Sequence, residues 1–122
     1  MDILALKNEF KTVCENNPMV YKIVDHGNYF VIFTKMLIDF EDSYLNLYLI
    51  FEDNGVCLSD SNEMYRIYDL CYDISSEMLE GFAKKLDLDY ENYRFTKFVK
   101  PETFDYEFQK FEKLKEMIEN LD

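Results

Sequence analysis

Acidic side chains gather near the ends of the strands that this chain is expected to form, and they are its best candidates for chemistry. The set comprises Asp39, Glu41, Asp42, Glu52, Asp53 and Asp60. Carboxylates that converge on one edge of a sheet can hold Mg²⁺, which polarises a phosphodiester for cleavage. One hypothesis is therefore a metal-dependent phosphodiester-cleaving enzyme built on Asp39, Asp42, Asp53 and Asp60.

Net charge weighs against this enzyme. The 122 residues include 25 acids and 13 bases, a formal net charge of −12. A field of this sign repels phosphate backbones and anionic membranes and attracts basic partners. A nuclease also needs a lysine beside its acids on strands, whereas the tight Glu9–Lys11 spacing falls on a predicted helix. We therefore expect a chain that is not an enzyme and that binds neither nucleic acid nor membranes directly.

Other catalytic and cofactor motifs are not found in the sequence. Glycines at positions 27, 55 and 81 cannot form a phosphate-binding loop or a dinucleotide fingerprint, and no G-x-S-x-G occurs. His26 is the single histidine and no Cys-x-x-Cys occurs, so a zinc site is not expected. Cys57 and Cys71 follow apolar patterns and are predicted to be small core residues. The sequence predicts no cofactor.

The stretch "FEDNGVCLSDSNEM", residues 51–64, accounts for several acids by local structure. Asn54-Gly55 is the strongest short hairpin signal in the chain and predicts a two-residue type I′ turn. That turn would set Glu52 opposite Cys57, with Asp53 in solvent at the hairpin tip.

Asp60 follows this hairpin and precedes a helical pattern of apolar residues. Asp60 and Glu63 have the spacing of a capping box. In this motif the side chain of each residue accepts a hydrogen bond from the backbone N–H of the other. We therefore interpret Asp60 as a helix cap.

Apolar periodicity predicts the elements that position these residues. Helices are expected at 2–16, after Asp60, after Ser75 and from Thr103 or Asp105 onward, and strands at 20–25, 28–37, 43–53, after Gly55 and at 92–99. The order α-β-β-β-β-α-α-β-α favours a single α+β domain, 1–122, with a mainly antiparallel sheet of about five strands covered by helices. The polar side of the last helix is expected to be solvated; it holds Glu107, Lys110, Glu112, Lys113, Lys115, Glu116 and Glu119.

Tyrosines add a second candidate surface. Tyr44 and Tyr48 share one strand face, and tyrosine is enriched at protein interfaces because it buries a large area at low entropic cost. An ordinary core margin would show the same pattern. The residues expected to contact a partner are Asp39, Glu41, Asp42, Glu52, Asp53, Asp87, Asp89, Glu91, Tyr44 and Tyr48.

From about Asp25 to its end, the chain resembles an uncharacterised domain family of bacteria and phages. The matching pieces are "LNLYLIFEDNGVCLSD" before a helix, "LEGFAKKLDLDYENYRF" and "FDYEFQKFEKLKEMIENL". In that family a strand–turn–strand ends in Leu-Ser/Thr-Asp-x-Gly and a Phe-rich C-terminal helix closes the domain; Asn62 stands here where the family often has glycine. The resemblance implies a shared fold and no catalytic residues. In size and acidity the chain also looks like small phage inhibitors such as anti-CRISPR proteins.

These observations favour a small acidic inhibitor or regulator over an enzyme. Its partner is expected to be a basic nucleic-acid-binding protein or complex, whose nucleic acid it would imitate. A structural accessory domain that forms a homodimer through its tyrosine faces is the remaining alternative. The start of the chain has no basic segment before an apolar run, and no window approaches 18 apolar residues, so a cytoplasmic protein is expected.

Overall fold

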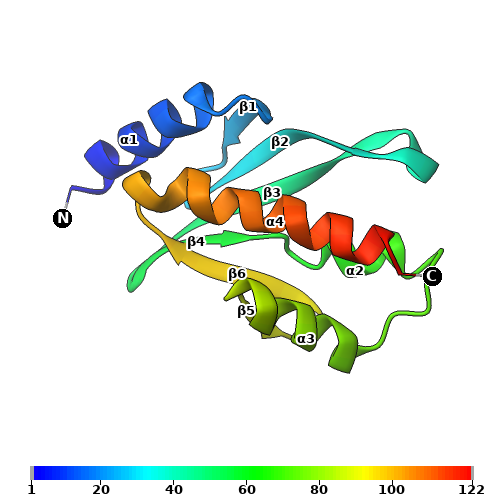
Figure 1. Cartoon of the computed structure of the whole chain (residues 1–122). Coiled ribbons are helices and arrows are strands. Elements are labelled where there is room, and N and C mark those ends of the chain that lie inside the picture. The colour runs from blue at the N-terminus through cyan, green and yellow to red at the C-terminus, as the bar shows by residue number, and fades with distance from the viewer. Residues whose placement is uncertain (1, 122) are drawn as a thin grey trace.

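A computed structural model of the chain describes residues 2–121 and shows an α+β fold, as predicted (Figure 1). The elements are α1 (Ile3–Asn16), β1 (Val20–Asp25), β2 (Tyr29–Ile38), η1 (Asp39–Glu41), β3 (Ser43–Glu52), β4 (Gly55–Ser59), α2 (Glu63–Tyr68), α3 (Ser76–Leu86), β5 (Asp89–Glu91), β6 (Arg94–Val99), η2 (Pro101–Thr103) and α4 (Phe104–Glu119). The order of the four α-helices is the predicted one, and the sheet has one strand more than expected.

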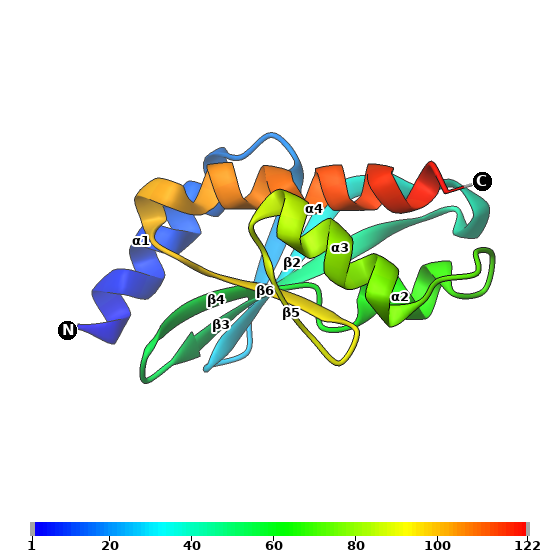
Figure 2. The same cartoon turned by 60° about the horizontal axis from the view of Figure 1, so that its bottom comes forward.

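The six strands form one antiparallel sheet in the order β1-β2-β3-β4-β6-β5. Alternate residues of β3, namely Leu45, Leu47 and Leu49, are fully buried, which confirms the predicted alternation. They belong to one cluster with buried residues of α1, α3 and α4, so these three helices lie on the same face of the sheet. Figures 1 and 2 show α4 along the sheet, with α1 near one of its ends.

The helix α4 is held by an apolar stripe, as predicted, but its polar side is not fully solvated. The stripe consists of Phe104, Phe108, Phe111, Leu114 and Ile118, each at most 1% exposed. Glu107, Lys110 and Lys115 were expected in solvent and are buried, because the neighbouring elements cover the flanks of α4. Both lysines pair with carboxylates of the same helix: Lys110 Nζ lies 2.8 Å from Glu107 Oε1, and Lys115 Nζ lies 2.9 Å from Glu119 Oε2.

The turn between β3 and β4 is not the predicted one. Glu52 pairs with Gly55, so the loop residues are Asp53 and Asn54 rather than Asn54 and Gly55. Neither loop residue has a positive φ, which a type I′ turn requires; the positive φ, 143°, falls on Gly55 at the start of β4. The register therefore differs by two residues from the prediction, with Ile50 opposite Cys57. A shift of two preserves the faces, so the burial pattern is unchanged.

The type I′ pattern occurs instead between β5 and β6. Asn92 and Tyr93 have φ values of 51° and 64°, and Glu91 pairs with Arg94 across them. Tyr93 lacks the freedom of glycine, and its ring packs against Tyr65 with centroids 4.1 Å apart. The sequence prediction missed β5 because three residues are too few to show a period of two.

The start of α2 matches the predicted capping box only in part: the Asp60 carboxylate accepts from Met64 N in the first turn, but Asn62 holds the N-cap position. Asp60 lies outside the helix, and its own backbone N–H donates to Phe95 O rather than to the Glu63 side chain. Asn62 adopts the left-handed region with φ 68°, where asparagine is better tolerated than most residues. Because α2 ends at Tyr68, Cys71 is exposed and does not join the core as predicted.

Candidate protein-interaction surface

Most of the chain's excess negative charge comes from three segments, 39–42, 63–77 and 116–121. They hold nine of the 25 acids and one of the 13 bases, Arg66, which leaves 16 acids against 12 bases elsewhere. The nine acids are Asp39, Glu41, Asp42, Glu63, Asp69, Asp73, Glu77, Glu116 and Glu119. The segments correspond to η1 with the residue after it, α2 with the loop that leads into α3, and the end of α4. We call this part of the molecule the acidic end.

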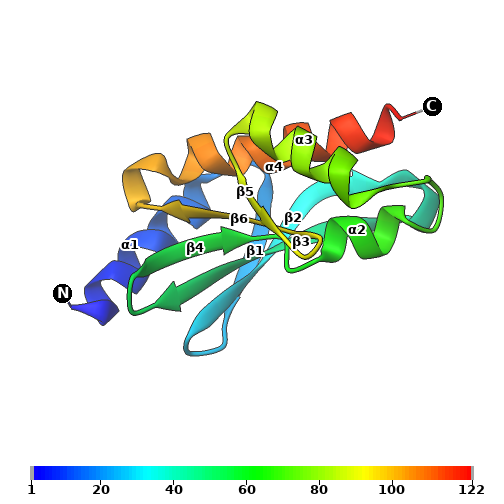
Figure 3. The ribbon, with the colours of Figure 1, turned by 90° about the horizontal axis from the view of Figure 1, so that it is seen from below.

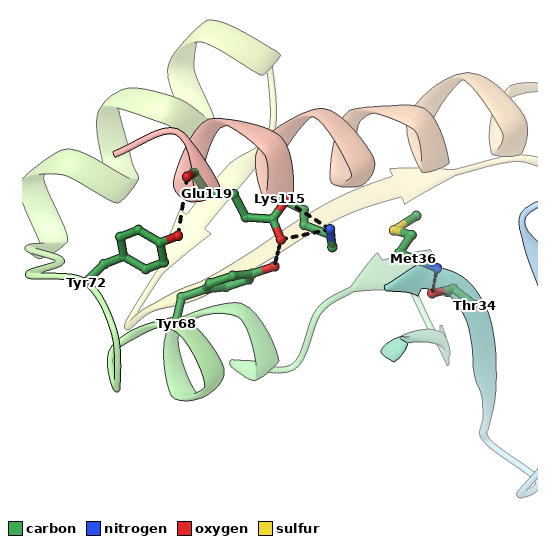
Figure 4. A network of polar contacts seen from close by, with 6 residues as sticks. All are labelled: Thr34, Met36, Tyr68, Tyr72, Lys115 and Glu119. Atoms are coloured by element: carbon green, nitrogen blue, oxygen red, sulfur yellow. Dashed lines mark hydrogen bonds and ion pairs between the residues drawn. The ribbon is translucent and has the colours of Figure 1, made fainter. Parts of the chain in front are cut away.

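Contacts of aromatic side chains hold the three segments of the acidic end together. Tyr68 of α2 is fully buried, and its ring lies 5.7 Å from that of Phe40 in η1. Its hydroxyl donates to Glu119 Oε2 of α4 at 2.6 Å, and Glu119 also pairs with Lys115 (Figure 4). The Tyr72 hydroxyl donates to the backbone oxygen of Glu119 at 3.3 Å. These contacts fix the segments before any partner arrives.

A bulge in β2 directs the chain toward the acidic end. The pairing of β2 with β3 shifts between Phe33 and Leu37, so residues 34–36 oppose a single residue, Leu45. Thr34 closes the bulge, because its hydroxyl donates to Leu45 O at 2.5 Å. The same hydroxyl accepts from Met36 N at 3.1 Å (Figure 4). The extra residues bend β2 just before η1.

Six of the nine acids point into solvent: Glu41, Asp42, Asp69, Asp73, Glu77 and Glu116. None of the ion pairs between residues 2 and 121 involves any of them. Glu63 and Glu119 are partly buried and bonded, since Glu63 pairs with Arg66 and accepts from the Tyr48 hydroxyl at 3.2 Å. Burial and the nearby Glu63 carboxylate raise the pKa of Tyr48 above its usual value. The acidic end therefore presents exposed carboxylates that form no ion pair among the described residues, beside two carboxylates that are bonded within the fold.

The structure distributes the predicted contact residues over three places. Glu41 and Asp42 lie at the acidic end together with the backbone of Asp39, and Tyr44 follows at the start of β3. Glu52 and Asp53 lie at the β3–β4 turn, the other end of a ten-residue strand and thus about 30 Å away. The predicted set does not form one continuous surface.

The third place is the edge of the sheet at β5. Asp89 and Glu91 are exposed on this edge strand. Asp87 caps the end of α3, and its carboxylate lies 3.2 Å from Lys97 Nζ and 3.9 Å from Lys110 Nζ. Asp87 is therefore used in part to hold α3 against β6 and α4.

The acids of the alternative metal site do not converge. Asp53 and Asp42 lie at opposite ends of β3, and Asp60 is fully buried with its oxygens bonded to backbone N–H groups. Among the described residues, no group of three or more His, Cys, Asp and Glu side chains could hold a metal ion.

Sequence reasoning found η1 but missed most of the acidic end. Asp69, Asp73 and Glu77 lie in a loop and a helix start; the prediction placed Asp69 and Glu77 in helices and took none of the three as a contact residue. The available signal was composition: the stretch 63–77 contains four acids and one base. Its closeness to η1 and to the end of α4 depends on tertiary contacts that local patterns do not reveal.

Comparison with known proteins adds no assignment: no family model, no curated protein and no solved structure matches the chain. The resemblance to the bacterial and phage family stays a prediction. Within residues 2–121, no helix has the length and apolar character needed to cross a bilayer.

Proposed function

We propose that this chain is a small acidic protein-interaction module whose acidic end binds the basic surface of a nucleic-acid-binding protein. Its carboxylates would occupy positions that nucleic-acid phosphates otherwise take, as expected of a phage or mobile-element inhibitor of the anti-CRISPR kind. The observation that supports this most is the gathering of nine acids and one base in three segments that meet around Tyr68.

The physical reasons are electrostatic. A cluster of unpaired surface carboxylates produces a local negative potential, which accelerates encounter with a positive surface and disfavours neutral or acidic partners. The bonds that Tyr68 and Tyr72 make to Glu119 hold the segments in place, so little ordering remains to oppose binding. Such binding weakens as salt screens the charges.

Affinity capture with three charge reversals tests the proposal. The immobilised chain should retain basic nucleic-acid-binding proteins from a bacterial lysate at low salt, and duplex DNA or high salt should release them. The variant Asp69→Lys/Asp73→Lys/Glu116→Lys should lose them. These positions avoid the first turns of helices, where a new lysine would oppose the helix dipole.

The matched control is Glu9→Lys/Glu15→Lys/Glu80→Lys, which changes net charge equally at exposed positions on α1 and α3. The control should retain the captured proteins. Equal loss from both variants would show that only total charge matters and would contradict the assignment to the acidic end. If no basic protein is retained by the unmodified chain, the proposal is wrong.

No observation in the described residues favours the metal-dependent enzyme, since Asp53 and the buried Asp60 lie apart from the segment that holds Asp39 and Asp42. Self-association rests on a different surface and is argued separately.

A further inference from the structure

The face of the sheet opposite α1, α3 and α4, here called the outer face, carries many apolar side chains, although only the start of α2 reaches it, where Glu63 accepts from the Tyr48 hydroxyl. In an antiparallel sheet with one covered face, the residues of the other face are normally polar. Here that face holds Tyr29, Val31, Phe33, Tyr48, Ile50 and Phe98, whose neighbours along each strand face the core. Phe98 is 49% exposed. Figure 3 shows the β3–β4 hairpin from below with no helix in front of it.

Strand pairing makes these side chains continuous across the sheet. Tyr29 lies opposite Ile50, Ile50 opposite Cys57, and Cys57 opposite Phe98. Cys57 is only 6% exposed because its neighbours in this row cover it. Contiguous apolar surface of this kind marks an interaction site more often than an accident of composition.

Most of the charge on the outer face lies at its two edges, and Glu52, at the end of β3, is the acid between them. Lys22 of β1 lies opposite Phe33, with its Nζ 4.9 Å from the Phe33 ring centroid, and Lys35 follows two residues further along β2. At the other edge, Asp89 and Glu91 of β5 pair with Thr96 and Arg94. One edge is therefore basic, and acids outnumber the single base at the other.

The basic and acidic residues also share a level along the strands. One row of the outer face joins Tyr48, Ser59 and Thr96. The next row toward the start of β3 and β6 contains Asn46 and Arg94. Asn46 is in line with Phe33 and Lys22, and Arg94 pairs with Glu91. Lys22 and Glu91 are thus at equal heights on opposite edges.

We propose that the outer face binds a second copy of this chain, about a two-fold axis lying between the sheets and close to the strand direction. This rotation keeps each row at its height and exchanges the edges, so Lys22 of one copy lies over Glu91 of the other. A two-fold axis across the strands would instead set lysines against lysines. Charge complementarity therefore selects both the occupant and the axis.

Shape agrees with this arrangement. The basic half of the outer face contains a hollow of about 590 Å³ lined mainly by Tyr21, Phe33, Lys35 and Tyr44. The same rotation brings the β5–β6 turn of the partner, with Asn92 at its tip, over this hollow. A six-stranded face is about 24 Å wide and 20 Å long, so the pair would bury about 1,000 Å² in total, near the lower bound for a specific interface.

The acidic ends stay available in such a pair. They belong mainly to the helix layers, which lie on the outer sides of the two stacked sheets. The sheets stack about 10 Å apart, and charges farther apart than the Debye length, about 8 Å at physiological salt, are largely screened from each other. The inference does not rest on the proposed function, because it uses a different face of the molecule.

Molar mass in solution, measured by sedimentation or light scattering, tests the inference. The unmodified chain should show twice its monomer mass at high concentration. Val31→Glu, on β2 within the outer face, should halve that mass, whereas Leu70→Glu, at an exposed apolar residue away from the face, should leave it unchanged. A monomer up to about 1 mM would overturn the proposal, because affinity weaker than that is not specific association.

A charge exchange tests the axis. Lys22→Glu/Lys35→Glu and Asp89→Lys/Glu91→Lys should each be monomeric alone, because each opposes like charges at both edges. Mixed together they should form a heterodimer in which both edges are complementary. Two results would overturn the arrangement. Either variant could still form a homodimer, or the mixed variants could fail to form a heterodimer although circular dichroism shows that each one folds.

Discussion

Asp60 shows how one buried carboxylate connects segments far apart in the chain. Its Oδ1 accepts from Phe95 N at 2.9 Å and its Oδ2 accepts from Met64 N at 3.1 Å, so it joins β6 to the start of α2. Its own N–H and C=O are also bonded, to Phe95 O and Glu63 N. Burial raises the pKa of Asp60 to about 6, and the backbone N–H groups only partly oppose that rise.

The raised pKa of Asp60 predicts a pH dependence of stability with a definite sign. Between about pH 4 and 6 the folded chain binds a proton that the unfolded chain has lost, so stability falls as pH rises through this window, by up to about 3 kcal/mol. Urea denaturation from pH 4 to 7 should show this loss in the unmodified chain relative to Asp60→Asn.

The comparison with Asp60→Asn separates this effect from other acids. Asp25 acts in the opposite direction, because the Gly27 N–H and the nearby lysines lower its pKa, and its contribution is lost as pH falls. Subtracting the two denaturation curves cancels Asp25. A difference that stays constant from pH 4 to 6 would refute the assignment to Asp60.

At the scale of elements, two glycines illustrate opposite roles. Gly55 starts β4 with φ 143°, and a Cβ added there would lie 3.1 Å from Phe98 Cδ1. Gly81 lies inside α3, and a Cβ there would meet nothing within 4 Å. Gly55 is required by the turn, whereas Gly81 only lowers helix propensity.

Alanine at each glycine should therefore change stability in opposite directions. Gly55→Ala should lower the free energy of unfolding by about 1–2 kcal/mol, through backbone strain and crowding of Phe98. Gly81→Ala should raise it by about 1 kcal/mol. Thermal or urea denaturation measures both, and a neutral Gly55→Ala would show that β4 can begin without a left-handed residue.

Local patterns predicted the long elements well and the short connections poorly. The alternation of Leu45, Leu47 and Leu49 and the Phe-rich stripe of α4 were visible because many residues repeat one period. Asn54-Gly55 signalled a hairpin correctly but not its turn, since glycine also serves after a loop of two other residues.

Burial of charge was beyond local patterns. The bond from Asp60 to Phe95 spans 35 residues, and the covered flank of α4 at Lys110 depends on neighbours distant in sequence. Local patterns could not predict the acidic end either, because its three segments meet only in the folded chain.

At the scale of the whole molecule, charge is unevenly spread. The three segments of the acidic end hold nine acids and one base, whereas the rest of the chain holds 16 acids and 12 bases. Like charges held together by Tyr68 and Glu119 repel one another in the folded state, and this cost is relieved by salt.

We therefore expect salt to stabilise the fold, and the effect should arise mainly from the acidic end. Raising sodium chloride should raise the melting temperature of the unmodified chain. In Asp69→Asn/Asp73→Asn/Glu116→Gln this rise should be smaller than in a matched control, Glu9→Gln/Glu15→Gln/Glu80→Gln. Equal salt dependence in both variants would indicate a general effect of net charge.

Burial also decides which thiol of the chain can react. A thiolate is the reactive form, and burial raises the pKa of Cys14 to about 12 and that of Cys57 above its usual value. Cys71 is exposed and lies between Asp69 and Asp73. A maleimide dye applied to the folded chain at neutral pH therefore labels Cys71, which places a fluorescent reporter within the acidic end without any substitution.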